Sequence, residues 1–148
     1  MGKGLKHAAM AVAVLAVVAG PASAESWARF TSSDRTMYLV DLDTLTPTDG
    51  MAVRLARVPA TGEASDLSHE VEAVDVRCSD KQTRSGETVA YGPDGAEADR
   101  YSEETPWEST PATGVYGSIA AFVCDDLRPA NSQAYPTIQA YIAAGRGG

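Results

Sequence analysis

The sequence is poor in the residues that carry catalysis and metal binding. It contains two cysteines, Cys78 and Cys124, and two histidines, of which only His69 lies beyond the N-terminal segment described next. Structural zinc sites take four Cys, His or carboxylate ligands, so this supply is too small if the cysteines pair. The chain also lacks a G-x-S-x-G motif, a Gly-rich phosphate loop and a C-x-x-C pair. We therefore expect no cofactor and no metal.

No apolar run is long enough to span a bilayer, which takes about 20 residues. The longest, residues 8–19, follows Lys3 and Lys6 and precedes the small-x-small tripeptide 22–24. This order is typical of a secretory signal peptide over residues 1–24, cleaved between Ala24 and Glu25. A hydrophobic helix that stays attached is the alternative. Because no cysteine lies near the cleavage site, we expect a periplasmic or secreted protein that is not lipid-anchored.

Basic residues are scarce in the predicted mature chain of 124 residues, 25–148. Loss of Lys3 and Lys6 leaves ten basic against twenty acidic side chains, a formal charge of −10. Repulsion from phosphates disfavours nucleic acid and anionic membrane surfaces as partners. The acidity serves solubility or a basic protein partner. The length predicts a single domain with its own core.

Alternating apolar and polar residues predict strands. The candidate strands are residues 27–30, 36–40, 51–58, 69–78, 83–91 and 98–102, with 41–45 at a sheet margin. Turns are expected at residues 47–50 and 92–95, where Asp-Gly pairs tolerate positive φ. In the fourth strand Val71 and Ala73 are out of phase with Val74, Val76 and Cys78. A bulge near Glu72 would reconcile the two sets.

One helix is expected late in the chain. Thr110 is a candidate cap with Pro111 at the first helical position. Val115, Ile119, Phe122 and Val123 then form one apolar stripe. Pro129 ends the helix. The domain is expected to cover residues 25–128, and residues 129–148 to form an extension with a weak helix at 135–144 and a frayed end at 145–148.

The two cysteines join these elements into one fold prediction. Val74, Val76 and Cys78 share a strand face, and Cys124 lies near the apolar stripe of the helix that is the best candidate to cover it. In an exported domain two cysteines usually pair, although two free thiols or a redox-active pair are alternatives. The bond would close about 45 residues and constrain the unfolded chain by about 4 kcal/mol. We predict an α+β fold: a curled antiparallel sheet of about five or six strands with one C-terminal helix bonded to it.

Several marks occur in an order that resembles a known family. Trp27 follows the signal, Tyr38-Leu39-Val40-Asp41 precedes a hairpin, and Cys78 ends a strand. Tyr91-Gly92, then Trp107 in a polar stretch, then Cys124 after a helix complete the series. Over residues 25–125 this order resembles the surface-adhesin protein E family of Gram-negative bacteria. The resemblance implies an antiparallel sheet with a disulfide-bonded C-terminal helix. It also implies a non-enzymatic role, such as binding host extracellular proteins like vitronectin or laminin.

An acidic stretch surrounds Trp107 and is the candidate binding site. Glu103, Glu104 and Glu108, with Glu97 and Asp99 before them, would form a rim for a basic partner with Trp107 as anchor. A solvated loop is the alternative, and Trp27 and Trp107 are more typical of sheet packing.

Two other groups of residues have side chains that could form a site. His69 with Asp66 or Glu70 would suit a small hydrolase, but a lone histidine after a polar loop is usually solvated. Asp41, Asp43 and Asp49 do not have the calcium-loop spacing, because Leu45 stands where a ligand belongs. We therefore expect a non-catalytic binding or envelope-accessory domain. The alternatives are an inhibitor of a basic cell-wall hydrolase and a hydrolase that uses His69.

Overall fold

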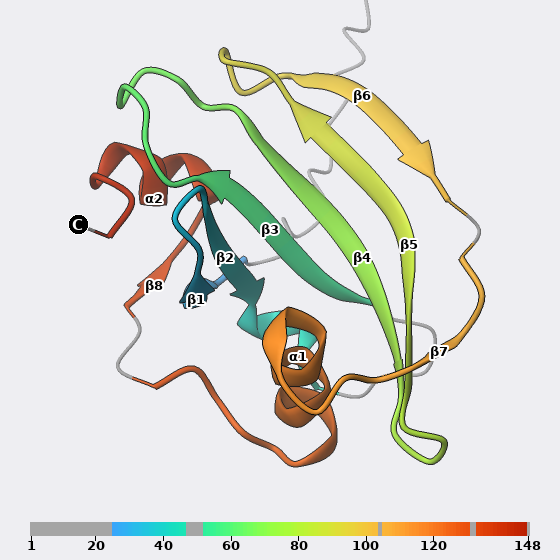
Figure 1. Cartoon of the computed structure of the whole chain (residues 1–148). Coiled ribbons are helices and arrows are strands. Elements are labelled where there is room, and N and C mark those ends of the chain that lie inside the picture. The colour runs from blue at the N-terminus through green and yellow to red at the C-terminus, as the bar shows by residue number, and fades with distance from the viewer. Residues whose placement is uncertain (1–24, 47–51, 104, 131–132, 148) are drawn as a thin grey trace, which may run out of the picture.

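The described residues form an antiparallel sheet with two helices. The computed structural model describes residues 25–46, 52–103, 105–130 and 133–147 (Figure 1). Its eight-stranded sheet has the order β6-β5-β4-β3-β2-β1-β8, with β7 paired to β5. The strands are β1 (Trp27–Ser32), β2 (Thr36–Asp41), β3 (Val53–Pro59), β4 (His69–Arg77), β5 (Gln82–Tyr91), β6 (Glu97–Ser102), β7 (Glu108–Ser109) and β8 (Ala134–Tyr135). The helices are a 3-10 turn η1 (Leu42–Thr44), α1 (Gly114–Cys124) and α2 (Ile138–Ala143).

The predicted fold class is confirmed, with a larger sheet than expected. The six long strands lie where alternation placed them. The count of five or six falls short because β7 and β8 have two residues each, too few to show a period. The predicted signal peptide, residues 1–24, and the predicted turn at residues 47–50 lie outside the described residues.

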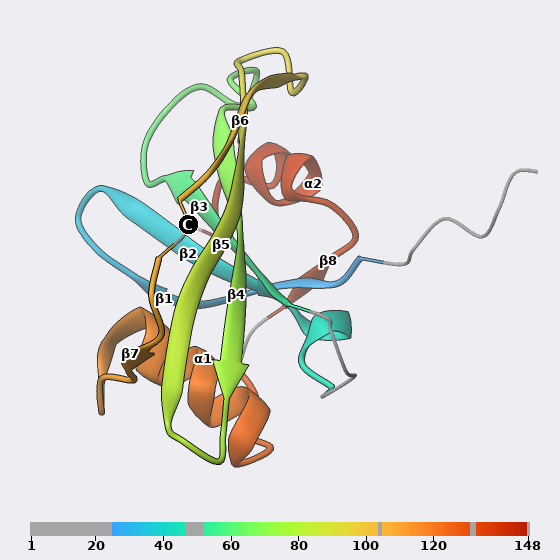
Figure 2. The same ribbon diagram turned by 90° about the vertical axis from the view of Figure 1, so that its right-hand side faces the viewer.

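Both faces of the sheet are covered, which the sequence prediction missed. Leu39 and Ala56 pack in the cluster that contains the side chains of α2. Their neighbours along the strands, Val40 and Leu55, pack in the cluster that contains α1. Because successive strand residues point to opposite faces, the two helices cover opposite faces. Figures 1 and 2 show α1 at one end of β4 and β5 and α2 toward the other end.

The two apolar sets on β4 follow from this double cover. Val71 packs on the α2 side and Val74 on the α1 side. The predicted bulge is present at this level, but on the neighbouring strand: β4 pairs regularly with β3, whereas β5 places an extra residue opposite Ala73. Gly86 lies in that bulge, and a Cβ there would come within 3.1 Å of the Ala73 carbonyl oxygen. Glycine therefore permits the close approach.

Helix α1 begins later than predicted. The Thr110 N–H donates to the Lys81 carbonyl at 2.9 Å, which holds this residue in the extended segment after β7. Thr113 is the N-cap instead, and its side chain makes no capping hydrogen bond. The predicted apolar stripe faces the sheet: Ile119 and Phe122 are buried there, and Val115 and Val123 pack against the same cluster. The backbone hydrogen bond between Thr110 and Lys81, in the β4–β5 hairpin, therefore outweighs the local preference of Thr110 for a helix N-cap.

The predicted disulfide between Cys78 and Cys124 is confirmed. The two Cα atoms are 5.6 Å apart, within the range that an unstrained bridge allows. Cys78 directly follows β4 and Cys124 is the last residue of α1. Both cysteines are exposed, so the bond fixes the helix end from outside the core.

The segment after residue 128 belongs to the same core rather than to a peripheral extension. Strand β8 pairs with β1, and Ile138, Tyr141 and Ile142 of α2 are buried. The prediction of a frayed end is wrong for residues 145–147, because Arg146 is only 5% exposed. Gly148 lies outside the described residues. Sequence polarity suggested a solvated tail, but the Tyr141 hydroxyl and both Nη atoms of Arg146 donate hydrogen bonds to carbonyl oxygens inside the protein.

Arg146 ties this chain end to the loop between β3 and β4. Its guanidinium donates to the carbonyl oxygens of Gly62, Glu63 and Asp66 at 2.8, 3.2 and 3.1 Å. Its own carbonyl accepts a 2.6 Å hydrogen bond from the Tyr141 hydroxyl. The backbone φ of Arg146 is +57°, and those of the flanking Gly145 and Gly147 are +87° and +74°. These bonds close one wall of the cleft described below.

Candidate functional site

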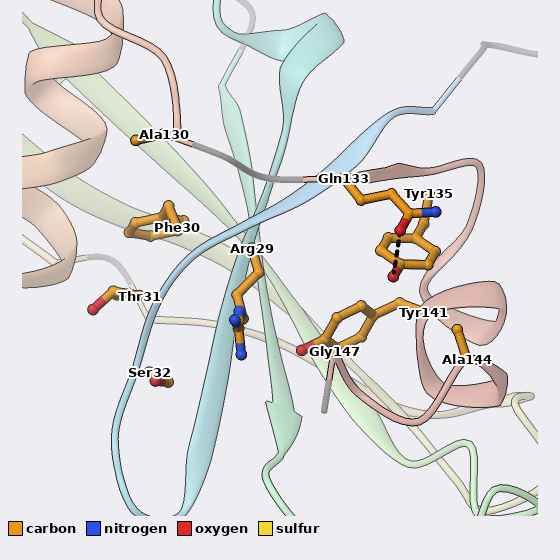
Figure 3. Close-up of a pocket in the computed structure, with 10 residues that line it drawn as sticks. All are labelled: Arg29, Phe30, Thr31, Ser32, Ala130, Gln133, Tyr135, Tyr141, Ala144 and Gly147. Carbon is orange, nitrogen blue, oxygen red and sulfur yellow. Dashed lines mark hydrogen bonds between the residues drawn. The ribbon is translucent and has the colours of Figure 1, made fainter.

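A cleft at the β1 edge of the sheet is the candidate functional site (Figure 3). Its volume is about 770 Å³, within the roughly 300–1,000 Å³ range of small-molecule sites. Three segments distant in sequence line it: β1, the stretch that leads into β8, and α2 with the residues that follow. The lining residues are Arg29, Phe30, Thr31, Ser32, Ala130, Gln133, Tyr135, Tyr141, Ala144 and Gly147.

The geometry of β1 and β8 opens this cleft. Strand β8 pairs only with Trp27 and Ala28, so the second half of β1 extends beyond it. The pairing of β1 with β2 is irregular between Arg29 and Thr31. At this bulge Phe30 turns to the α1 side and meets the Phe122 ring edge-on, with centroids 5.5 Å apart. The cleft consequently follows the sheet edge. Arg29 contributes a charged guanidinium to its lining, and Phe30 contributes an aromatic ring.

Arg29 and Tyr141 give the cleft its polar character. Figure 3 shows both side chains ending on the same side of β1. The Arg29 Nη1 lies 3.8 Å from the Met37 sulfur, a weak acceptor. Burial raises the pKa of the Tyr141 phenol, and the Arg29 charge opposes part of the rise. The phenol is therefore neutral at physiological pH, and Arg29 is the one formal charge among the described lining residues.

Aromatic rings supply the apolar part of the lining. Tyr135 and Tyr141 pack edge to face, with centroids 5.3 Å apart. The Tyr135 hydroxyl is 3.4 Å from the Gln133 side-chain oxygen, as the dashed line in Figure 3 marks. Gly147 completes this wall, where a Cβ would lie 3.4 Å from the Tyr141 ring. The ring contact with Tyr135 and the hydrogen bond from the Tyr141 hydroxyl to Arg146 fix the side chain of Tyr141. This wall of the cleft is therefore preformed.

Within the acidic stretch predicted as a binding rim, the Trp107 ring already contacts two arginines of this chain. Trp107 is half-buried, and the guanidinium carbons of Arg77 and Arg84 lie 4.0 and 4.6 Å from its ring centroid. These cation–π contacts occupy ring surface that a cationic partner would otherwise use. Glu103 and Glu108 are exposed. Glu104 lies outside the described residues.

His69 is buried rather than solvated, which corrects the expectation for a histidine after a polar loop. It is 6% exposed and stacks on Tyr91 with centroids 4.4 Å apart. Its Nδ1 lies 2.7 Å from the Leu67 carbonyl oxygen, and burial lowers the pKa of the ring. The predicted orienting residue Asp66 accepts hydrogen bonds from Ser68 instead. Backbone and stacking contacts therefore fix this ring.

A buried polar network escaped the sequence analysis. Glu72 is 2% exposed, accepts a 3.0 Å hydrogen bond from the Tyr116 hydroxyl and pairs with Arg57. Burial opposes the charge on Arg57, but Glu72 outweighs it and raises the pKa of the guanidinium. The signal available in the sequence was a glutamate in phase with Val74 on a buried strand face. This network joins β3, β4 and α1.

Asp41, one of the three aspartates whose spacing does not fit a calcium loop, has a structural role. Asp41 is 2% exposed and its side chain accepts from the Ser26 and Asp43 N–H groups, which caps η1. Asp49 lies outside the described residues. Within residues 25–46, 52–103, 105–130 and 133–147, no three His, Cys, Asp or Glu side chains come together as a metal site. The helices in this part of the chain are too short or too polar to cross a membrane.

Comparison with known proteins adds no relative. No protein-family model, curated protein or solved structure matches the chain.

Proposed function

We propose that the mature chain is an exported, non-catalytic binding domain, comparable in role to the surface-adhesin protein E family that its sequence resembles. Its ligand would sit in the cleft between β1 and the C-terminal segment. The observation that carries this proposal is the cleft itself: about 770 Å³, lined by three aromatic rings and one arginine. Polar groups make up most of its exposed lining, and the aromatic rings add apolar surface beside one guanidinium, so the cleft offers both polar and apolar contacts to a ligand.

The surrounding framework supports a binding role. The cleft is formed from a sheet covered on both faces, and one of its walls is tied down by Arg146. The disulfide fixes α1, whose Phe122 backs Phe30. A preformed site loses little conformational entropy when a ligand binds.

A basic protein partner is a second candidate, favoured by the exposed carboxylates of β6 and β7. Glu97, Glu103 and Glu108 are all exposed on this edge. Together with the formal charge of −10, they would speed encounter with a cationic protein such as a basic cell-wall hydrolase. Trp107 contributes less to such an interface than the sequence suggested, because Arg77 and Arg84 contact its ring. A hydrolase that depends on His69 remains the alternative from a different class, and it requires activity that His69→Ala abolishes.

A cleft-filling variant tests the proposal. Ala144 is exposed and lines the cleft, so Ala144→Trp would fill it; Ala64→Trp, in the exposed β3–β4 loop, is the matched control. Each mature protein is incubated with envelope extract, purified in native form and analysed by native mass spectrometry for retained molecules. The expected result is a ligand mass on the wild type and Ala64→Trp but not on Ala144→Trp. Equal retention by all three proteins would reject the cleft as the site.

A further inference from the structure

We propose that the cleft takes a small organic anion, with its acidic group on Arg29 and a planar apolar body against Tyr135 and Tyr141. This inference rests on the proposed function, because it names the chemistry of the ligand that the same cleft would hold. It makes one demand that the proposed function does not: binding must depend on negative charge.

The charge distribution points to an anion. The predicted mature chain has twice as many acidic as basic side chains, yet the lining of this cleft contains Arg29 and no carboxylate among the described residues. A guanidinium carries five N–H donors in a planar fork that matches carboxylate geometry. It can therefore hold an anion while keeping other contacts. Arg29 is half-buried, where an ion pair is screened less than on an open surface.

The neighbouring groups fit an aromatic or otherwise flat body. The Tyr141 hydroxyl donates its hydrogen bond to the Arg146 carbonyl oxygen, and burial raises the pKa of the phenol. The side chain is therefore neutral and does not repel an anion. The rings of Tyr135 and Tyr141 meet edge to face and line the cleft on the α2 side, whereas Phe30 lines it from the α1 side, where it packs on Phe122. Flat apolar groups pack well against such rings.

The edge geometry favours a small molecule over an added β-strand. An extended peptide would need a regular row of backbone groups along the second half of β1. The irregularity between Arg29 and Thr31 interrupts that row. Bulges of this kind protect sheet edges against strand addition. The occupant to which the structure commits is thus a compact anion rather than a polypeptide strand.

Two fluorescent probes with the same ring skeleton test the charge requirement. 1-Anilinonaphthalene-8-sulfonate carries a sulfonate, and N-phenyl-1-naphthylamine is the neutral counterpart. Both are titrated into the mature wild type, Arg29→Gln, Ala144→Trp and the control Arg35→Gln, which removes an exposed arginine outside the cleft. Charge-assisted hydrogen bonds of this type predict a sulfonate-probe affinity at least tenfold weaker for Arg29→Gln. The neutral probe should be unaffected, and Arg35→Gln should stay within twofold of the wild type for both.

A measurement on the unaltered protein guards against misfolding of Arg29→Gln. Raising sodium chloride from 0.05 to 0.5 M should weaken the sulfonate probe severalfold and leave the neutral probe unchanged. If salt and Arg29→Gln leave the sulfonate probe unaffected, the anion proposal is wrong. If, in addition, Ala144→Trp reduces neither probe, the cleft does not bind and the proposed function fails with it. Loss of both probes in Ala144→Trp alone would retain the cleft and reject only the anion.

Discussion

The buried Glu72 carboxylate accepts a hydrogen bond from the Tyr116 hydroxyl at 3.0 Å, which joins the middle of β4 to the first turn of α1. Arg57 of β3 pairs with the same carboxylate. The helix is thus attached to the sheet at both ends: by this network near its start and by the disulfide at its last residue. The two attachments differ in kind, and the predictions below separate them.

Removal of Glu72 should cost more than removal of its hydrogen-bond donor. Glu72→Ala leaves Arg57 without its buried partner, so we expect the free energy of unfolding to fall by about 3 kcal/mol. Tyr116→Phe removes the hydroxyl that donates to Glu72 and accepts from Arg57 at 3.1 Å but leaves the ion pair in place, and it should cost about 1.5 kcal/mol. Urea denaturation followed by circular dichroism measures both. Equal losses in the two variants would show that the ion pair with Arg57 contributes nothing beyond the Tyr116 contact.

Loss of the disulfide should destabilise the fold without releasing α1 completely. The bond joins residues 46 apart, so the chain-entropy model predicts a loss of about 4 kcal/mol for the double variant Cys78→Ala/Cys124→Ala. Burial of Ile119 and Phe122 should keep the helix packed. Non-reducing mass spectrometry of the wild type checks the bond, and urea denaturation of the variant checks the energy. Alkylation of either cysteine in unreduced, folded wild type would contradict the pairing.

Arg146 should be a major contributor to stability despite its place near the chain end. Arg146→Ala leaves the carbonyls of Gly62, Glu63 and Asp66 without this donor, and we expect a loss of about 3 kcal/mol. Arg128→Ala is the control, because that side chain is 45% exposed. Its loss should stay within about 0.5 kcal/mol. The amide hydrogens of α2 should exchange faster than in the wild type for Arg146→Ala but not for Arg128→Ala. Similar exchange rates in the two variants would mean that Arg146 does not hold the C-terminal segment in the core.

Stability should fall as the pH drops below about 6.5 because of His69. Burial lowers the pKa of this ring in the folded state, from an ordinary value of 6.5, so the unfolded chain binds the proton first. The contribution is complete above pH 6.5 and is lost as the pH falls toward the folded-state pKa. His69→Phe keeps the stack on Tyr91 and removes the titration. Denaturation at pH 7.5 and 5.5 should therefore show a larger drop for the wild type; parallel drops would mean that carboxylates alone set the pH dependence.

The strands and the disulfide were accessible from the sequence because their signals are local or depend on few residues. Alternation along six residues or more marks a strand wherever it pairs. The face that carries Val74 and Cys78 pointed to a covering helix, and the only other cysteine, Cys124, lies at the end of the best candidate. Elements of two residues carry no such period, which is why β7 and β8 were missed.

The cleft was beyond the reach of sequence reasoning. Arg29, Gln133 and Tyr141 lie in three separate segments, and each looks ordinary in its own context. The acidic stretch around Trp107 stood out because its residues are consecutive, but the residues that contact the ring, Arg77 and Arg84, come from a hairpin some 20–30 residues earlier. Chemistry that depends on convergence from distant segments leaves no local pattern.

The sequence by itself determined where the chain extends, which faces are apolar and which two sulfurs pair, because backbone period and cysteine scarcity act over short range. Tertiary structure alone decided that α1 starts at Gly114, that α2 covers the second face and that Arg146 is buried. In each case a hydrogen bond or a packing contact between distant residues outweighs a local preference of about 1 kcal/mol. Such contacts exist only once the sheet has brought their partners together.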